Sequence, residues 1–530
     1  MPTVPLELEK LIDSIDGKKS YGPMSLPVHL LKLYKEFFSF WLSKLVNMSF
    51  DSGVFPDIFK IARVTPIHKK ESKLNYLNYR PISLLSVFSK IYKKLIYTRV
   101  YEFLTKYNLI SSKQFGFRKS YSTTHAIISI TERIKYLLDK GQFVCGIFID
   151  LEKAFDTVNH DILCDKLNYY GLRGNVINLF KSYLSDRKQY VTINGVQSET
   201  KNVTCGVPQG SSLGPLLFLI YINDFSFCLN QTETGHFADD TYLLYSSQKL
   251  KTIETIINTE LKLVSKWLRL NKLSLNSAKT EFILFRSPRR PVDFNMVIKL
   301  DGKKLKPVKF VKYLGIFIDE HLSWNTHVQH LCKKLSRATG ILSKLRYNAP
   351  LKTCLSVYFA LFYQPIIYGC NAWSLTSEAN LDKIEKIQNK VVRIITFSDF
   401  NSPSNNLFIR LKIVKFRDIL KMQHLKLAFE HSLNAIPTEL RKLFTFCSYE
   451  HVANMAFKSV RKKCLEIPRI KSVLFGDKSV RNHCATLWKY FVTKVIKLDE
   501  INNLDMTRIH NVHQLKRKLK KHFLFTYTLA

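Results

Sequence analysis

The stretch FVCGIFID, residues 143–150, decides how this chain folds, because an uncharged apolar run ends in a single carboxylate. A continuous apolar run of this length is typical of a strand that is buried on both faces of a sheet. The sequence therefore predicts a buried central strand over residues 143–149, with Asp150 at its tip.

A second group of acids lies in the segment GHFADDTYLLY, residues 235–245. Apolar and β-prone residues flank Asp239 and Asp240, so we expect a hairpin with a two-carboxylate turn. Adjacent aspartates in a turn are usually solvated, and the pair alone would favour that interpretation. Inside an apolar hairpin, however, like charges repel each other unless a cation neutralises them. We therefore expect Asp150, Asp239 and Asp240 to form a metal-binding cluster.

The expected metal is Mg²⁺, with Mn²⁺ as the alternative, because carboxylate oxygens are hard ligands. Two such ions about 3.5–4 Å apart stabilise both the attacking and the leaving oxygen in phosphoryl transfer. That reaction needs positioning and charge more than covalent chemistry. The sequence contains no C-x-x-C pair, nucleophile elbow or P-loop that would indicate other chemistry. We expect a two-metal nucleotidyl-transfer site.

The charge balance indicates the partner. There are 81 Lys and Arg against 42 Asp and Glu, a formal net charge of +39. This excess favours nucleic acid, whereas a generic basic protein or a membrane-surface binder is the alternative. The 10 scattered cysteines are expected to be reduced, in an intracellular protein that is nuclear or cytoplasmic.

No segment has the pattern of a secretory signal or of a membrane-spanning helix. The longest nearly uncharged run, residues 354–370, contains Gln364 and Pro365 and is expected to be a buried helix that breaks at Pro365.

Periodicity along the chain predicts a mixed fold. Helices are expected over residues 28–46, 86–107, 123–139, 213–225 and 252–270, and strands over residues 61–67, 189–193, 280–285 and 311–319. Asn194-Gly195 predicts a hairpin turn. From residue 327 onward the chain is mostly helical and basic, with a linker at residues 402–406. The fold class is therefore α+β, followed by an all-α half.

The acidic segments belong to an ordered series of motifs that resembles the reverse transcriptases of non-LTR retrotransposons. The series comprises FIDLEKAFD (148–156), which resembles motif A; GVPQGS (206–211), motif B; FADD (237–240), motif C; LN (275–276) with KT (279–280), motif D; and YLG (313–315), the primer grip. Upstream, NYRPISL (78–84) and QFGFR (114–118) resemble the two fingers motifs. The sequence KAFDTVNH (153–160) is similar to the corresponding sequences of the jockey-like branch of the LINE elements.

The resemblance implies a right-hand polymerase fold, with fingers, a palm that has an antiparallel sheet, and a helical thumb. The expected parts are an N-terminal helical extension (1–47), the reverse transcriptase domain (48–319), the thumb (320–400) and an α-helical basic C-terminal region (401–530). In the last part, KRKLKK (516–521) is either a patch that binds a nucleic-acid backbone or a solvated helix face.

The resemblance also implies roles at the catalytic centre. Asp150 and Asp239 would bind both ions, Asp240 would support them, and Leu151 would lend its backbone carbonyl to a metal. Phe155 occupies the place of a steric gate that excludes the ribose 2′-hydroxyl and so favours DNA precursors.

Other positions would contact the incoming nucleotide or the primer. Gln209 would line the nucleotide, and Gly210 would let the backbone approach the template base pair. Arg80 and Arg118 are candidates for the triphosphate, although a structural or template-backbone contact is equally open. The remaining assignments are Lys279, a general acid for the pyrophosphate; Tyr313, Leu314 and Gly315, the primer grip; and Asp156, expected to fix its own turn rather than bind metal.

The implied function is an RNA-directed DNA polymerase that adds dNTPs to a primer 3′-hydroxyl. Its expected partners are an RNA template, a DNA primer or target DNA, and dNTPs, without a membrane. Such elements usually carry an endonuclease ahead of the polymerase, and we expect this chain to lack it, as a truncated copy or fragment would. The alternative is an inactive or domesticated nucleic-acid-binding remnant. A viral RNA-dependent RNA polymerase is disfavoured by Phe155 and Ala238.

Overall fold

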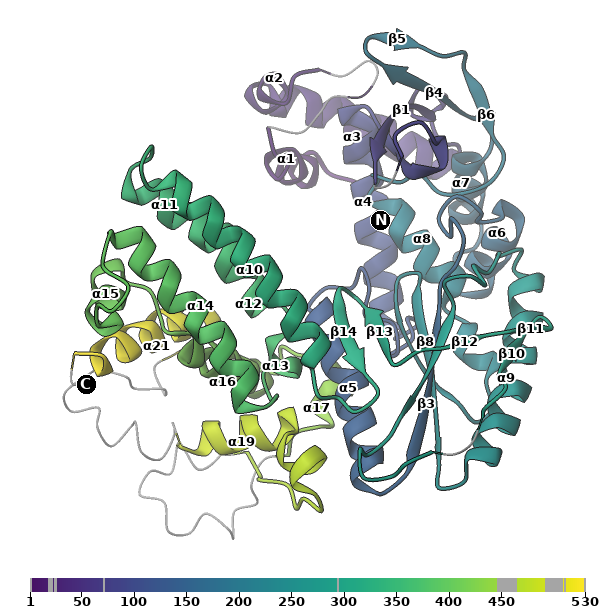
Figure 1. Cartoon of the computed structure of the whole chain (residues 1–530). Coiled ribbons are helices and arrows are strands. Elements are labelled where there is room, and N and C mark those ends of the chain that lie inside the picture. The colour runs from purple at the N-terminus through teal and green to yellow at the C-terminus, as the bar shows by residue number, and fades with distance from the viewer. Residues whose placement is uncertain are drawn as a thin grey trace, which may run out of the picture. The chain divides into compact units, whose positions relative to one another are not determined.

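The computed structural model describes residues 2–17, 22, 26–69, 72–292, 295–445, 465–490, 509 and 511–528 (Figure 1). Contacts between Cα atoms divide the chain into two compact units. Unit 1 comprises Met1–Phe117, Asp150–Asn230 and Thr259–Ser277; unit 2 comprises Arg118–Ile149, Gln231–Asn258 and Ala278–Ala530. The domain boundaries expected from the sequence stay predictions.

Unit 1 contains a sheet in the order β2-β1-β4-β5, with β6 also paired to β4. Its strands are β1 (Ile61–His68), β2 (Tyr79–Leu84), β4 (Arg187–Ile193), β5 (Val196–Gln197) and β6 (Lys201–Val203). β1 and β2 are antiparallel, whereas β1 and β4 are parallel. The predicted hairpin after β4 is confirmed, because Asn194 and Gly195 both have positive φ, as a tight hairpin turn requires.

The other elements of unit 1 are helices and short helical turns. They are α1 (Pro5–Asp13), α2 (Val28–Leu33), α3 (Lys35–Ser52), α4 (Val87–Lys106), α6 (His160–Tyr169), α7 (Asn175–Leu184) and α8 (Leu213–Ile222), with 3-10 turns at Asp57–Phe59, Tyr76–Asn78 and Phe225–Cys228. α4 begins where the Ser86 side chain accepts a hydrogen bond from the Ser89 backbone N–H. Its buried face includes Ile91, Leu95, Val100 and Leu104.

Two predicted helices of unit 1 have different bounds in the structure. The helix expected over residues 28–46 is broken at Tyr34, whose φ of −106° and ψ of 33° lie outside the helical range. The helix expected over residues 213–225 ends at Ile222. At its start, the Ser211 hydroxyl accepts from the Gly214 backbone N–H at 2.9 Å.

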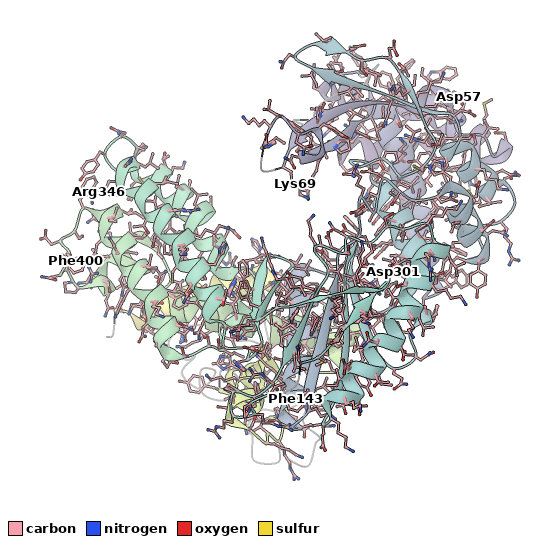
Figure 2. All side chains as sticks on the ribbon, turned by 45° about the vertical axis from the view of Figure 1, so that its right-hand side comes forward. Asp57, Lys69, Phe143, Asp301, Arg346 and Phe400 are labelled. Atoms are coloured by element: carbon pink, nitrogen blue, oxygen red, sulfur yellow. The ribbon has the colours of Figure 1, made fainter. Side chains whose placement is uncertain are left out.

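Unit 2 is built on a sheet in the order β12-β9-β3-β8-β7. The strands are β3 (Phe143–Ile149), β7 (Glu233–Phe237), β8 (Asp240–Ser247), β9 (Glu281–Phe285) and β12 (Lys306–Pro307). β3 lies in the middle, antiparallel to both neighbours, and all of its residues are buried, as predicted. Helix α5 (Thr123–Asp139) packs against β3, and Figure 2 marks the start of the strand at Phe143.

Two further hairpins follow in unit 2. The first joins β10 (Lys299–Leu300) and β11 (Lys303–Lys304) through a turn at Asp301, labelled in Figure 2. The second joins β13 (Phe310–Tyr313) and β14 (Ile316–Asp319). The single strand expected over residues 311–319 is therefore wrong, because Leu314 and Gly315 both have positive φ and reverse the chain.

The rest of unit 2, in the residues that the structure describes, is mostly helical, as predicted. Its helices are α10 (Asn325–Leu345), α11 (Leu351–Val357), α12 (Gln364–Ile367), α13 (Cys370–Trp373), α14 (Glu378–Thr396), α15 (Ser404–Leu411), α16 (Phe416–Ser432), α17 (Thr438–Arg441), α19 (Val480–Tyr490) and α21 (Val512–Thr526), with π-helical turns at Tyr358–Tyr363 and Val473–Asp477. Helix α9 (Leu250–Leu270) belongs to both units: its residues up to Asn258 are in unit 2, and those from Thr259 are in unit 1.

Two expectations in this helical region are corrected. The helix expected over residues 354–370 does not break at Pro365, and the chain stays helical to Ile367. A π-helical segment directly precedes α12, so Pro365 lies in the first turn of α12, where its missing N–H costs no helical hydrogen bond. This helical stretch also buries only one side, since Phe359 and Leu361 are exposed. The expected linker at residues 402–406 is partly helical, because α15 begins at Ser404.

The α+β class is confirmed, with an antiparallel arrangement around β3 and helices in the C-terminal half. Among the described residues, no helix is long and apolar enough to cross a membrane.

Candidate active site

The acids of unit 2 lie on the β7–β8 hairpin. Phe237 pairs with Asp240, so the connection consists of Ala238 and Asp239, and Ala238 has a φ of 58°. Asp239 is half-buried in the turn, whereas Asp240 is exposed at the first position of β8. The predicted two-carboxylate turn therefore holds one acid in the turn and one at the start of a strand.

Buried hydrogen bonds between side chains and backbone of β7 and β8 stabilise this hairpin. The Thr234 hydroxyl donates to the backbone carbonyl of Tyr242 at 2.9 Å, and Nδ1 of His236 lies 2.9 Å from the Thr241 hydroxyl. Burial lowers the pKa of His236 to about 3, so its ring is neutral at pH 7. A neutral buried histidine that hydrogen-bonds across the strands keeps the turn in one register.

Asp150, in unit 1, is the first residue after β3. Its backbone carbonyl accepts from the Asn276 N–H at 2.9 Å, and Glu152 N–H donates to the Ser274 carbonyl at 2.9 Å. Leu151 is buried and forms an isolated bridge with Leu275. The motif-A-like segment is thus tied to the segment that resembles motif D.

The three predicted metal ligands are divided between the two compact units of the structure. Among the residues that it describes, no group of three or more His, Cys, Asp or Glu side chains is placed to hold a metal ion. Asp150 belongs to unit 1, whereas Asp239 and Asp240 belong to unit 2.

Within unit 1, the loop after Asp150 is joined to the motif-B-like segment by its backbone. Val207 N–H donates to the Phe155 carbonyl, and Gly206 N–H donates to the Val158 carbonyl, both at 2.8 Å. Gly206 has a φ of 85°, and a Cβ there would lie 2.6 Å from the Asp156 carbonyl oxygen. Only glycine therefore fits this close approach.

We expect Gly206→Ala to lower the free energy of unfolding by about 2–4 kcal/mol, because it adds a backbone clash to an unfavourable φ. The matched control is Gly195→Ala, where φ is 84° and no atom lies within 4 Å of an added Cβ. That variant should lose only about 1–2 kcal/mol. Urea unfolding of both variants checks this, and equal losses would contradict the close-approach argument.

Two aromatic contacts hold the Phe155 ring. It stacks on Phe218 of α8, with ring centroids 4.5 Å apart and an interplanar angle of 30°. It also meets the Phe117 ring edge-on at 6.2 Å. Phe218 is fully buried in α8, so Phe155 rests on a rigid support while it stays half-buried itself.

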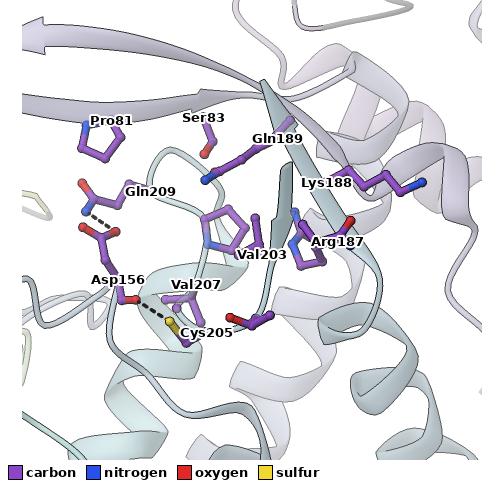
Figure 3. Close-up of a pocket in the computed structure, with 15 residues that line it drawn as sticks. Pro81, Ser83, Asp156, Arg187, Lys188, Gln189, Val203, Cys205, Val207 and Gln209 are labelled. Atoms are coloured by element: carbon purple, nitrogen blue, oxygen red, sulfur yellow. Dashed lines mark hydrogen bonds between the residues drawn. The ribbon is translucent and has the colours of Figure 1, made fainter. Parts of the chain in front are cut away.

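A side-chain hydrogen bond connects the two motifs as well (Figure 3). Gln209 Nε2 donates to Asp156 Oδ1 at 2.9 Å. Burial raises the pKa of Asp156, and the hydrogen bond from Gln209 partly offsets this. The expectation that Asp156 would fix its own turn missed this partner, because Gln209 lies far along the chain and local turn chemistry could not reveal it.

The same segment is bonded to the sheet of unit 1. Ser83 N–H, in β2, donates to the Gln209 carbonyl at 2.8 Å. Gly210 has a φ of 103°, and a Cβ there would lie 3.0 Å from the Ser83 carbonyl oxygen. Gln209 and Gly210 therefore lie against the end of β2.

A cavity of about 300 Å³ opens beside this junction (Figure 3). It is lined by residues of β1, β2, β4, β6 and the motif-B-like segment. Its polar and charged lining residues are Ser83, Asp156, Arg187, Lys188, Gln189, Asn202, Thr204, Cys205 and Gln209. The Cys205 thiol lies 3.4 Å from the Asp156 carbonyl oxygen. Sequence analysis did not identify the residues of β4 and β6 in this lining, because their spacing carries no motif.

The predicted cations lie on separate elements. Arg80 is exposed on β2 in unit 1. Arg118, in unit 2, lies over the Tyr121 ring, with its guanidinium carbon 4.2 Å from the ring centroid. Lys279 precedes β9 in unit 2.

The primer-grip-like segment forms the β13–β14 turn. The Tyr368 hydroxyl donates to the Leu314 carbonyl at 2.6 Å and so fixes the turn. Tyr313 is buried, and its ring lies 5.7 Å from those of Phe148 and Tyr242. The turn is therefore packed onto the same sheet that carries Asp240.

Comparisons with known proteins agree with this arrangement of motifs. Residues 67–318 match the family model described as reverse transcriptase (RNA-dependent DNA polymerase). A probable RNA-directed DNA polymerase from transposon BS of Drosophila melanogaster is 29% identical over 418 residues, which cover 75% of this chain and 45% of the relative. The RNA-directed DNA polymerase from mobile element jockey of the same fly is 26% identical over 452 residues, which cover 83% and 49%.

The chain spans about half the length of these curated relatives. A solved structure of telomerase from Candida albicans with a fragment of telomeric RNA is 13% identical and covers 74% of this chain and 68% of its own, with a TM-score of 0.37, too low to support an argument. The family match and the ordered motifs agree: residues 67–318 match the reverse transcriptase family, and the chain is similar to the RNA-directed DNA polymerases of the BS and jockey elements.

Proposed function

We propose that the chain is an RNA-directed DNA polymerase that adds dNTPs to a primer 3′-hydroxyl. The observation that carries the proposal is where the acids of the family-matched segment stand on the sheet. Asp150 directly follows the fully buried strand β3, and Asp240 opens the neighbouring strand β8. Strand ends are rigid supports, and a transfer reaction that depends on positioned charge needs such supports.

The proposed metal ligands are Asp150, Asp239, Asp240 and the backbone carbonyl of Leu151. Two features support them. The β3–β8 ladder ends with the pair Ile149 and Thr241, so Asp150 and Asp240 are the next residues beyond it on each strand. All four donors are oxygens, which suit a divalent ion; we propose Mg²⁺, with Mn²⁺ as a substitute. When bound, such ions stabilise charge on the attacking and leaving oxygens.

Phe155 is proposed as the steric gate against ribonucleotides. Its stacking on Phe218 supports the proposal, because the ring cannot swing away from a nucleotide without losing that contact. A gate works only if it is held in place, since a free ring would move aside for a 2′-hydroxyl.

Gln209 is proposed to line the incoming nucleotide, with Asp156 as its positioning residue. In this hydrogen bond the side-chain nitrogen Nε2 of Gln209 donates to Asp156, which leaves the side-chain oxygen Oε1 of Gln209 as an acceptor. Gly210 lets the backbone lie close to the template base pair. Arg80, Arg118 and Lys279 remain proposals for phosphate contacts.

The proposed partners are an RNA template, a DNA primer or target DNA, and dNTPs. The net charge of +39 supports a polyanionic partner of this kind. We also propose an intracellular location, in the nucleus or the cytoplasm, because nucleic acid is found there.

The test is primer extension by the purified full chain. It receives a DNA primer on an RNA template with dNTPs and Mg²⁺, and binding to the same primer-template is measured in parallel. We expect extension that depends on the RNA template. Tight binding without any extension would contradict the proposal and would indicate a nucleic-acid-binding remnant instead.

A further inference from the structure

Helices α2 and α3 of unit 1 expose a continuous row of large apolar side chains. We call this row the α3 stripe; it consists of Leu33, Tyr34, Phe37, Phe40, Trp41, Leu45 and Met48. Phe37 is 62% exposed, Trp41 54% and Met48 70%. Single exposed apolar residues are common on proteins, but contiguous rows of this size mark interaction surfaces.

The opposite face of α3 contacts the rest of unit 1 with fully buried small and aliphatic side chains, together with the half-buried rings of Phe38 and Phe50, which pack against Phe88 and Tyr92. Its buried residues are Ser39, Leu42, Ser43, Val46 and Ser49. The Ser39 and Ser43 hydroxyls donate to backbone carbonyls of the helix itself, and the Ser39 hydroxyl also lies 3.3 Å from a carboxylate oxygen of Glu9 on α1. α3 thus exposes the aromatic face that a surface helix normally buries. The aromatic face is therefore left for another partner.

The spacing of the stripe indicates that this partner is a helix. Tyr34, Phe37, Trp41, Lys44 and Met48 alternate steps of three and four residues, the repeat by which two helices pack along a seam. Lys44 is the single charge on that seam. Its ammonium lies 4.3 Å from the Phe40 ring centroid and 4.9 Å from that of Trp41, so the rings already stabilise it.

The charge around the stripe favours a second copy over nucleic acid. In residues 1–60, seven lysines balance seven Asp and Glu residues, in a chain whose net charge is +39. This segment of zero net charge gives a polyanion little attraction, and two copies of it can meet without strong repulsion. Elsewhere the basic excess would oppose self-association.

The stripe is also large enough for a dimer. Its exposed side-chain area is on the order of 700 Å² per copy, close to the roughly 800 Å² per partner of a standard stable interface. A pair of identical chains with a two-fold axis uses the same patch on both copies.

We propose that a second copy of this chain covers the α3 stripe, with the two α3 helices antiparallel and crossing at Trp41. In this arrangement Phe37 faces Leu45 of the second copy and Tyr34 faces Met48. The proposal is independent of the polymerase activity, so a failure of either leaves the other standing.

The test measures the mass of the full chain by light scattering, after nuclease treatment and in high salt so that RNA cannot bridge copies. We expect twice 61.8 kDa for the wild type. The double variant Phe37→Glu/Trp41→Glu should raise the dimer Kd at least about 100-fold, because two central aromatic anchors are lost. The matched control is Tyr169→Glu/Phe227→Glu, which replaces two exposed aromatic residues elsewhere in unit 1 and should keep the dimer.

A disulfide cross-linking experiment tests the dimer without added charge, so its result does not depend on whether the Phe37→Glu/Trp41→Glu variant folds. Trp41→Cys places one thiol beside the two-fold axis, so oxidation should join two copies, whereas Tyr169→Cys should not. A wild-type mass of 61.8 kDa at micromolar concentration would overturn the proposal. So would a dimer that persists in the Phe37→Glu/Trp41→Glu variant, or one that nuclease dissolves.

Discussion

Asp239→Ala is expected to reduce the rate of primer extension at least about 100-fold, while primer-template binding stays as tight as before or tighter. The variant removes a proposed metal ligand from the β7–β8 turn, so charge that develops in the transition state loses its stabilisation. The turn itself should survive, because the buried contacts of His236 and Thr234 hold the hairpin. Single-turnover extension and equilibrium binding are measured on the same preparation.

The matched control for this prediction is Asp165→Ala. Asp165 is an exposed carboxylate on α6 and is not one of the proposed ligands. It should extend primers at the wild-type rate. If Asp239→Ala retained more than about a tenth of the wild-type rate, Asp239 would not be a ligand of the catalytic ions, since loss of such a group costs more.

Phe155→Val is expected to weaken discrimination against ribonucleotides by roughly 10- to 200-fold, the range found when a close steric contact is opened. The smaller side chain leaves room for a 2′-hydroxyl, so incorporation of rNTPs should rise while use of dNTPs changes little. The measurement is the ratio of kcat/KM for a dNTP and the matching rNTP on one template.

Loss of the Phe155 ring also removes the stack on Phe218, so a control for packing is needed. Phe227→Val changes an exposed aromatic residue of unit 1 and should leave the ratio unchanged. A Phe155→Val enzyme that discriminates as the wild type does would refute the gate. A fall in dNTP use without any gain in rNTP use would show that the ring serves packing alone.

The parts of the fold that the sequence predicted well are those with strong periodicity. The run over residues 143–149 and the helix over residues 123–139 have the predicted bounds in the structure. Both elements are deeply buried, so their buried positions carry apolar residues and the apolar periodicity is clear in the sequence. The β7–β8 hairpin was predicted for the same reason, since its apolar residues flank a short polar turn.

Backbone details were predicted less well. A periodic pattern does not show where a chain leaves helical dihedrals, so the break at Tyr34 was missed. Leu314 gives no turn signal of its own, although it adopts positive φ beside Gly315. Pro365 was expected to end a helix, but the preceding π-helical turn absorbs the missing hydrogen bond.

The candidate site was only partly predictable. The three aspartates were predicted from the apolar segments that carry them, and the resemblance added Gln209 and the order of the motifs, because the motifs are local in sequence. The Asp156–Gln209 hydrogen bond joins segments distant in sequence, so no local pattern could indicate it. The orientation of α3 is a similar case. Helical spacing was visible in residues 28–46, but spacing does not say which face meets the core.

The central claim is that Asp150 and the Asp239–Asp240 pair share bound metal, and metal-directed cleavage tests it most directly. Fe²⁺ replaces Mg²⁺ in the full chain bound to primer-template, and peroxide with ascorbate then cuts the backbone close to the bound ion. The account predicts cuts near Leu151 and near Ala238 together, and the loss of both in Asp239→Ala. Cuts at only one of these segments, or cuts that persist in Asp239→Ala, would contradict it.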